Sequence, residues 1–108
     1  MAAEKNFENK IKGWLKDHDC YFVKFFANRM TKTGVPDILA SVNGYFVGIE
    51  VKAQNGKPSE LQMHNVRKIR ESGGFAYVVY PSGWEELKKI LEELLNENFS
   101  KEGKEILK

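Results

Sequence analysis

With 108 residues, 42% of them hydrophobic, the chain can form one folded domain with its own core, but it has no room for a second catalytic domain. Cys20 is the only cysteine, which excludes an internal disulfide, a cysteine-rich zinc site and a thiol redox pair. No stretch approaches the ~18 apolar residues of a membrane span, so we expect a soluble, cytoplasmic protein. The formal net charge of +2 is too small to indicate a nucleic-acid partner by itself.

The first half of the chain is predicted to contain one helix and three strands. Apolar residues recur at helical spacing within residues 4–17, which predicts an amphipathic helix. Aromatic and β-branched residues dominate residues 20–27, which predicts a strand. Residues 37–42 and 45–52 are two apolar runs separated by Asn43-Gly44, and such a pair is the strongest short-range signal of an antiparallel hairpin.

The second half is predicted to contain two helices with a strand between them. Ser59 to Gln62 and Ser82 to Glu85 both have the form of a capping box, so we expect helices to begin at each and to run to about residues 72 and 96. Residues 75–80 are predicted to be a buried strand. The resulting order, αβββαβα, predicts a single α/β domain over residues 1–96 with helices on both faces of a mixed sheet, followed by a charged tail at 97–108.

Three charged residues interrupt the predicted hairpin. Asp37 begins one strand, and Glu50 and Lys52 lie near the end of the other, on the same face because side chains alternate along a strand. A two-residue turn at Asn43-Gly44 would bring Asp37 and Glu50 opposite each other at the open end of the hairpin. Two carboxylates this close need a cation, and Mg²⁺ is suited to oxygen ligands. With Lys52 beside it to assist a water molecule, this arrangement fits phosphodiester hydrolysis.

The spacing of these three residues also has a purely structural interpretation. Asp37 could end a turn after Pro36, and Glu50 and Lys52 could form the solvent-exposed face of an amphipathic strand. An Asp followed after twelve residues by Glu-x-Lys is a short pattern that occurs by chance. The spacing alone leaves both interpretations open.

Four segments together resemble the VRR-NUC family of PD-(D/E)xK nucleases: GVPD at 34–37, GIEVK at 48–52, PSELQ at 58–62, and Gly73-Gly74 followed by an apolar strand. The resemblance spans about residues 4 to 80 and implies a restriction-endonuclease-like αβββαβ core, to which this chain adds a C-terminal helix. It implies that Asp37, Glu50 and the main-chain carbonyl of Val51 bind Mg²⁺ or Mn²⁺, and that Lys52 assists the attacking water.

Two further residues have both a structural and a catalytic interpretation. Members of the family resemble this chain in having a glutamate on the first helix, here Glu8, which lies at the edge of the core-facing stripe but could instead form an exposed pair with Lys12. Gln62 corresponds to a glutamine near the metal site of the family. It is also the third helical residue of a capping box, and the two roles are compatible.

The predicted function is a metal-dependent DNA endonuclease that selects a DNA structure such as a four-way junction, a flap or a duplex. Arg29, Lys32 and Lys57 are candidates to bind phosphates around the site. The similar archaeal Holliday-junction resolvases act as homodimers, so the resemblance implies a dimer, and small stand-alone members suggest a bacterial or phage source. The alternatives are a catalytically silent DNA-binding domain of the same fold and an RNA or single-strand nuclease.

Overall fold

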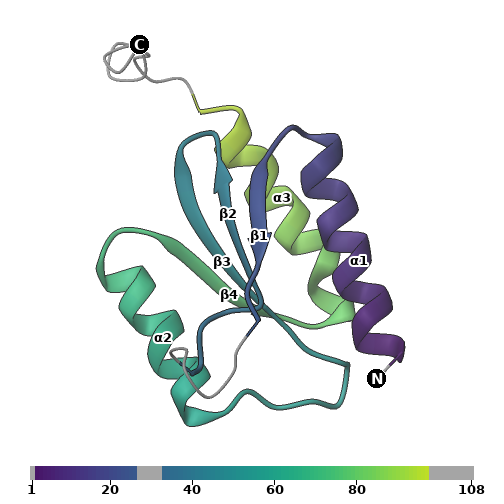
Figure 1. Ribbon diagram of the computed structural model, residues 1–108. Helices are drawn as coiled ribbons and strands as arrows, with labels where there is room; N and C mark the ends of the chain where they lie inside the picture. Colours follow the sequence, from purple (N-terminus) through teal and green to yellow (C-terminus); the bar gives the residue numbers. More distant parts are fainter. Residues whose placement is uncertain (1, 27–32, 98–108) are drawn as a thin grey trace.

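The computed structural model describes residues 2–26 and 33–97 (Figure 1). Its elements follow the predicted order: α1 (Ala2–Asp17), β1 (Tyr21–Lys24), β2 (Ile38–Val42), β3 (Tyr45–Val51), α2 (Glu60–Glu71), β4 (Phe75–Val79) and α3 (Trp84–Leu95), with a short 3₁₀ turn, Pro81–Gly83, before α3. The α/β fold class is therefore confirmed. No helix in the described ranges is long and apolar enough to cross a membrane. The predicted tail lies, apart from Glu97, outside the described residues.

The four strands form one mixed sheet in the order β1-β2-β3-β4. Strands β1, β2 and β3 are antiparallel neighbours, whereas β3 and β4 are parallel because α2 carries the chain back between them. Asn43 and Gly44 have φ values of 52° and 88°, the left-handed pair that a tight two-residue hairpin turn requires. The turn pairs Val42 with Tyr45 and thereby sets the register of the whole hairpin.

Helices cover both faces of the sheet, as predicted (Figure 1). Helices α1 and α3 bury their apolar stripes against one face, in a core whose strand residues are Ile38, Ala40, Val42, Val47, Ile49, Val51 and Val79. Trp84 and the leucines of α3 belong to this core, so that helix packs on its own sheet. Helix α2 lies on the other face, where a side chain at Gly48 would meet Ile69 at 3.0 Å.

The predicted start of the last helix is wrong in detail. Helix α3 begins one residue after Gly83, and no side chain caps it. Ser82 lies in the 3₁₀ turn, where its hydroxyl accepts a hydrogen bond from Gln54 and its N–H donates to the oxygen of the same amide. The Ser82 side chain therefore binds Gln54 in the loop after β3 and does not form the capping box that the sequence suggests. The capping box of α2 at Ser59 and Gln62 is confirmed.

Strand β1 is shorter than predicted, because its partner β2 begins only at Ile38, which pairs with Lys24. One more bond, from Phe25 N–H to the Asp37 carbonyl at 2.8 Å, continues the contact. Pro36, which precedes Asp37, has no N–H with which to extend the ladder of hydrogen bonds. The chain therefore leaves the sheet beside Asp37.

The loop that leads into Asp37 is pressed against α2. Gly34 has a φ of +82°, and a Cβ atom there would lie 2.8 Å from the Leu61 backbone and from the Asn65 side chain. Asn65 is buried and donates hydrogen bonds to the carbonyls of Leu61 at 2.9 Å and Thr33 at 3.3 Å. Only glycine meets both requirements at position 34, so this residue fixes the approach of the chain to Asp37.

We predict that Gly34→Ala destabilises the protein by about 1–3 kcal/mol, because the methyl group enters occupied space at a backbone angle that alanine disfavours. Urea denaturation would measure the change. Gly13→Ala is the matched control, since a Cβ in the middle of α1 meets no atom within 4 Å. The control should stabilise the protein by about 0.5–1 kcal/mol, because glycine is a poor helix former. Equal effects of both substitutions would contradict this account of the loop.

Candidate active site

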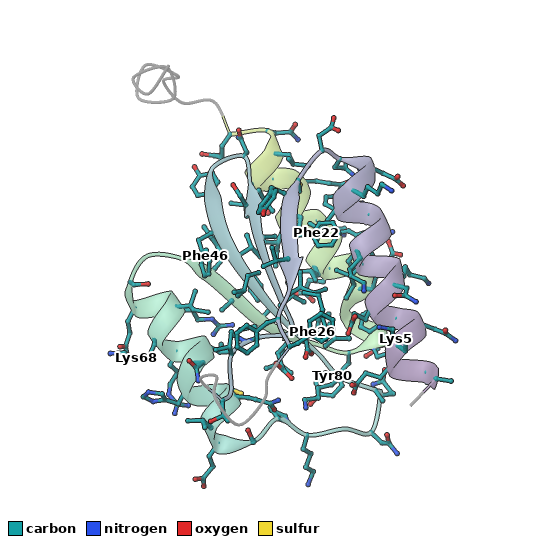
Figure 2. All side chains as sticks on the ribbon, viewed as in Figure 1. Lys5, Phe22, Phe26, Phe46, Lys68 and Tyr80 are labelled. Carbon is teal, nitrogen blue, oxygen red and sulfur yellow. The ribbon has the colours of Figure 1, made fainter. Side chains whose placement is uncertain are left out.

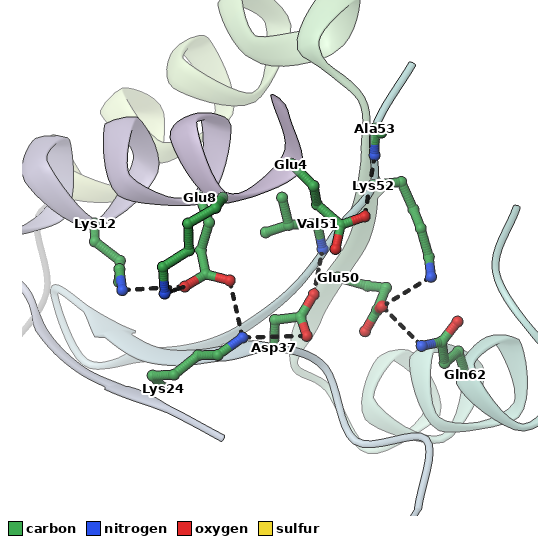
Figure 3. Close-up of polar contacts among 11 residues, drawn as sticks. Glu4, Glu8, Lys12, Lys24, Asp37, Glu50, Val51, Lys52, Ala53 and Gln62 are labelled. Carbon is green, nitrogen blue, oxygen red and sulfur yellow. Dashed lines mark hydrogen bonds and ion pairs between the residues drawn. The ribbon is translucent and has the colours of Figure 1, made fainter. Parts of the chain in front are cut away.

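The three charged residues singled out in the hairpin meet at its open end (Figure 3). Ile38 pairs with Ile49, so Asp37 and Glu50 occupy the next position outward on the two strands. Lys52 follows on the face of Glu50, and its ammonium lies 3.4 Å from Glu50 Oε2. The predicted convergence of Asp37, Glu50 and Lys52 is therefore present.

Both oxygens of Asp37 have partners. Oδ2 accepts a hydrogen bond from the Val51 N–H at 2.9 Å, which fixes the carboxylate against the end of β3. Oδ1 accepts a longer one, 3.4 Å, from the ammonium of Lys24 at the end of β1. The side chain is about a quarter exposed, at 27%. Asp37 is thus held by one strong backbone contact and one weaker contact to a cation.

Glu50 is almost completely buried, at 2% exposure. Its Oε2 accepts a hydrogen bond from Gln62 Nε2 at 2.8 Å, whereas Oε1 is buried with no hydrogen-bond partner in the described parts of the chain. Burial and then the negative charge of Asp37 raise the pKa of Glu50 to about 7, although Lys52 opposes the shift. A carboxylate in this position is costly unless a further positive charge approaches it.

The Gln62 side chain takes part in two contacts at once, one in the capping box of α2 and one with Glu50. Its side-chain oxygen accepts from the Ser59 N–H at 2.8 Å, which completes the capping box of α2. Its side-chain NH₂ group donates to Glu50 at 2.8 Å. The amide therefore connects the start of α2 to the buried carboxylate.

Glu8 faces the site and is not the exposed helix residue of the alternative interpretation. It is 5% exposed, and Lys24 contacts its Oε1 at 2.8 Å. The pair with Lys12 also exists, since Lys12 lies 3.0 Å from Glu8 Oε2, but it has no good hydrogen-bond geometry. Burial would raise the pKa of Glu8, yet the hydrogen bond from Lys24 and the positive charges of Lys24 and Lys12 lower it overall. Glu8 is thus held by two lysines.

A comparison with protein families gives one finding that covers nearly the whole chain. The family model of archaeal Holliday junction resolvases (Hjc) matches residues 2–100. The chain belongs to this family. Hjc proteins are structure-selective, metal-dependent DNA endonucleases that resolve Holliday junctions, so the predicted endonuclease function is confirmed at the level of the family. A comparison with curated proteins found no match.

Two of the narrower expectations change. The resemblance to nucleases of the PD-(D/E)xK class is confirmed, but the family is Hjc and not specifically VRR-NUC. The motifs that carried the resemblance, around Asp37, Glu50 and Lys52, identify the class and not the family within it. The matching family is described as archaeal, which does not support the expected bacterial or phage source.

The remaining sequence candidates are the three phosphate-binding residues. Arg29 and Lys32 lie outside the described residues. Lys57 is exposed in the loop between β3 and α2, which follows Lys52.

Two residues that the sequence did not single out reach the site from the outside. Lys24 joins Glu8 to Asp37, and Glu4 on α1 accepts a hydrogen bond from the Ala53 N–H at 3.3 Å (Figure 3). The sequence does contain a signal for Lys24. It is a lysine within the aromatic segment before the hairpin, and the strand formed by that segment, β1, pairs with the strand that follows Asp37. Glu4 had no comparable signal, since its contact depends on the angle at which α1 crosses the sheet.

The donor set fits a divalent cation of the kind that Hjc nucleases use. The unpartnered oxygen of Glu50 and the neighbouring carboxylate of Asp37 are hard oxygen ligands, and burial together with the charge of Asp37 raises the pKa of Glu50, a shift that a bound cation would oppose. Within residues 2–26 and 33–97 no group of three His, Cys, Asp or Glu side chains could hold a metal ion. Two carboxylates therefore need ligands from the main chain, water or DNA to complete a coordination shell.

The raised pKa of Glu50 predicts a pH dependence of the metal-free protein. Because the folded-state pKa of about 7 exceeds the ordinary 4.5, folding favours the protonated form. The stabilising contribution is complete below pH 4.5 and is lost as the pH rises to about 7. We predict that Glu50→Gln, which resembles the protonated form, is more stable than the parent by about 1–3 kcal/mol near pH 8.

Urea denaturation in the presence of a chelator, near pH 5 and near pH 8, would measure this difference. Near pH 5 the parent and Glu50→Gln should have similar stabilities, because Glu50 is then largely protonated in the folded parent. A stability difference that is the same at both pH values would contradict the assignment of the shift to Glu50.

Proposed function

We propose that Asp37, Glu50 and the carbonyl of Val51 hold the divalent ion, Mg²⁺ or Mn²⁺, with which the protein hydrolyses DNA. The observation that carries this proposal is the buried Glu50 Oε1, which has no hydrogen-bond partner among the described residues and lies beside a second carboxylate. When bound, the ion would polarise a phosphoryl oxygen and lower the pKa of the attacking water.

Strand geometry supports the proposed role of the Val51 carbonyl. The Val51 N–H donates to Asp37, whereas the next N–H, of Lys52, donates to Val79 on β4 at 3.0 Å. In an extended strand, the N–H and C=O of one residue point to the same side. The Val51 carbonyl is therefore directed toward Asp37, where it can serve as a neutral third ligand.

Lys52 is proposed to act on the reacting groups directly. Its side chain is 16% exposed and shares the face of Glu50, so its ammonium can orient the attacking water and offset negative charge that develops on the phosphate. Gln62 is proposed to keep Glu50 in position through the bond at 2.8 Å. Glu8 is proposed to act through Lys24, since its own carboxylate is occupied by ammonium groups.

DNA binding is proposed to involve basic residues on both sides of the site. Lys57 follows Lys52 in the chain, and Arg29 and Lys32 lie between β1 and Asp37. Such residues would bind phosphates and not bases, which suits an enzyme that selects the shape of a junction. We infer a cytoplasmic location, where the DNA substrate lies.

We further propose that residues 1–96 form the working unit and that two copies associate. The face of the sheet opposite α1 has an uncovered part, beyond the reach of α2, where Tyr21 is 75%, Phe46 48% and Val23 42% exposed. Apolar residues gathered in this way on a sheet typically mark a protein contact. A two-fold dimer would present two active sites to the two strands that a four-way junction requires to be cut.

We predict that the protein cleaves a labelled four-way junction in the presence of Mg²⁺ or Mn²⁺, and that Asp37→Asn and Lys52→Met each reduce the cleavage rate at least about 100-fold. The substitutions remove a metal ligand and the charge next to the phosphate while preserving side-chain size. The assay would include flap, duplex and single-stranded DNA and a single-stranded RNA, with labels on all four junction arms to reveal paired cuts.

Lys68→Met serves as the matched control, because Lys68 is an exposed residue of α2 (Figure 2) and its ion pair within residues 2–26 and 33–97 is with Glu71. It should cleave at the parent rate. Full activity of Asp37→Asn or Lys52→Met would refute the proposed site, and stronger cleavage of single strands or RNA would refute the proposed substrate.

A further inference from the structure

Lys24 connects α1 to the proposed metal site. It is the last residue of β1, next to the bond between Phe25 N–H and the Asp37 carbonyl. Its ammonium lies 2.8 Å from Glu8 Oε1 and 3.4 Å from Asp37 Oδ1, and the side chain is only 20% exposed. Figure 3 shows the ammonium between the two carboxylates. Lys24 therefore neutralises two acids that would otherwise repel each other across the space between α1 and β2.

The two oxygens of Asp37 differ in how firmly they are held. Oδ2 accepts the 2.9 Å bond from a backbone N–H, which is part of the sheet and cannot move away. Oδ1 has the longer, 3.4 Å contact to the ammonium of Lys24, and a lysine stem has several rotatable bonds. An ion that binds Asp37 and Glu50 together thus reaches Asp37 most readily through Oδ1, the oxygen that Lys24 occupies.

A divalent ion and an ammonium group on the same oxygen repel each other strongly, because the site is only partly exposed to screening solvent. The Lys24 ammonium already contacts Asp37 Oδ1. Binding of the ion at this oxygen therefore favours movement of the ammonium away from Asp37.

We propose that Lys24 is an internal counter-cation of the metal site: it holds Asp37 and Glu8 together in the metal-free protein and is displaced from Asp37 when a divalent ion binds. Lys24 is a positioning residue in this scheme and does not touch the reacting groups. It stabilises the metal-free fold and at the same time weakens metal binding. The inference rests on the proposed assignment of Asp37 and Glu50 as ligands.

The test is the binding of Mn²⁺ without DNA, measured by calorimetry, together with the thermal stability of the metal-free proteins. Lys24→Met should bind Mn²⁺ at least about fivefold more tightly than the parent, since the competing charge is gone, and should melt at a lower temperature without metal. Lys24→Gln should show the same two changes if the methionine variant folds poorly. Lys24→Arg retains the charge and should restore both properties toward those of the parent.

Lys12→Met is the matched control. It removes the same charge from another lysine that contacts Glu8, at 3.0 Å, but forms no ion pair with Asp37 within the described residues. Its Mn²⁺ affinity should change less than about twofold. An equal gain in Lys12→Met would show a general charge effect and would overturn the proposal.

The remaining outcomes separate this inference from the proposed function. If the parent binds Mn²⁺, Asp37→Asn does not, and Lys24→Met binds with unchanged or weaker affinity, Asp37 remains a ligand and the displacement of Lys24 is wrong. If Asp37→Asn binds Mn²⁺ as tightly as the parent, or if the parent binds no Mn²⁺, the proposed metal site is wrong. The displacement of Lys24, which rests on that site, is then wrong as well.

Discussion

The repulsion between Asp37 and Glu50 is the interaction on which the site depends. Glu50 is 2% exposed, one of its oxygens has no hydrogen-bond partner in the described structure, and its pKa rises to about 7. Folding alone would not favour two acids in such a position, because a buried carboxylate without a partner costs free energy. Lys52 compensates only in part, from 3.4 Å. A strained arrangement of this kind is expected where binding of a cation or substrate, and not stability, has determined the residues.

The rest of the fold keeps these two carboxylates from moving apart. The tight turn at Asn43-Gly44 sets the hairpin register, and the Val51 N–H holds Asp37 against β3. On the other side, the loop at Gly34 is seated on α2, and the same helix supplies Gln62 to Glu50. The hairpin and α2 therefore act together, so that a change in the packing of α2 would reach the active site through two separate contacts.

Much of this could be predicted from the sequence, because the decisive interactions are local. The Asn43-Gly44 turn fixes the register of the hairpin, so the residues that face each other can be found by counting outward from the turn. Strand alternation places Glu50 and Lys52 on one face. The capping box at Ser59 is equally local, and it is present. The failures depended on tertiary contacts. The Ser82 side chain binds Gln54, a residue 28 positions away, and therefore does not cap α3. The contacts of Lys24 and Glu4 depend on how α1 lies against the sheet.

The most direct test of the account is the position of a metal ion in a crystal of the protein soaked with Mn²⁺ and measured by anomalous diffraction. The account predicts one strong anomalous peak within about 2.0–2.6 Å of an oxygen of Asp37 and of Glu50 Oε1, with the ammonium of Lys24 moved away from Asp37. A fully occupied peak that contacts only one of these carboxylates, or that lies elsewhere on the protein, would contradict it.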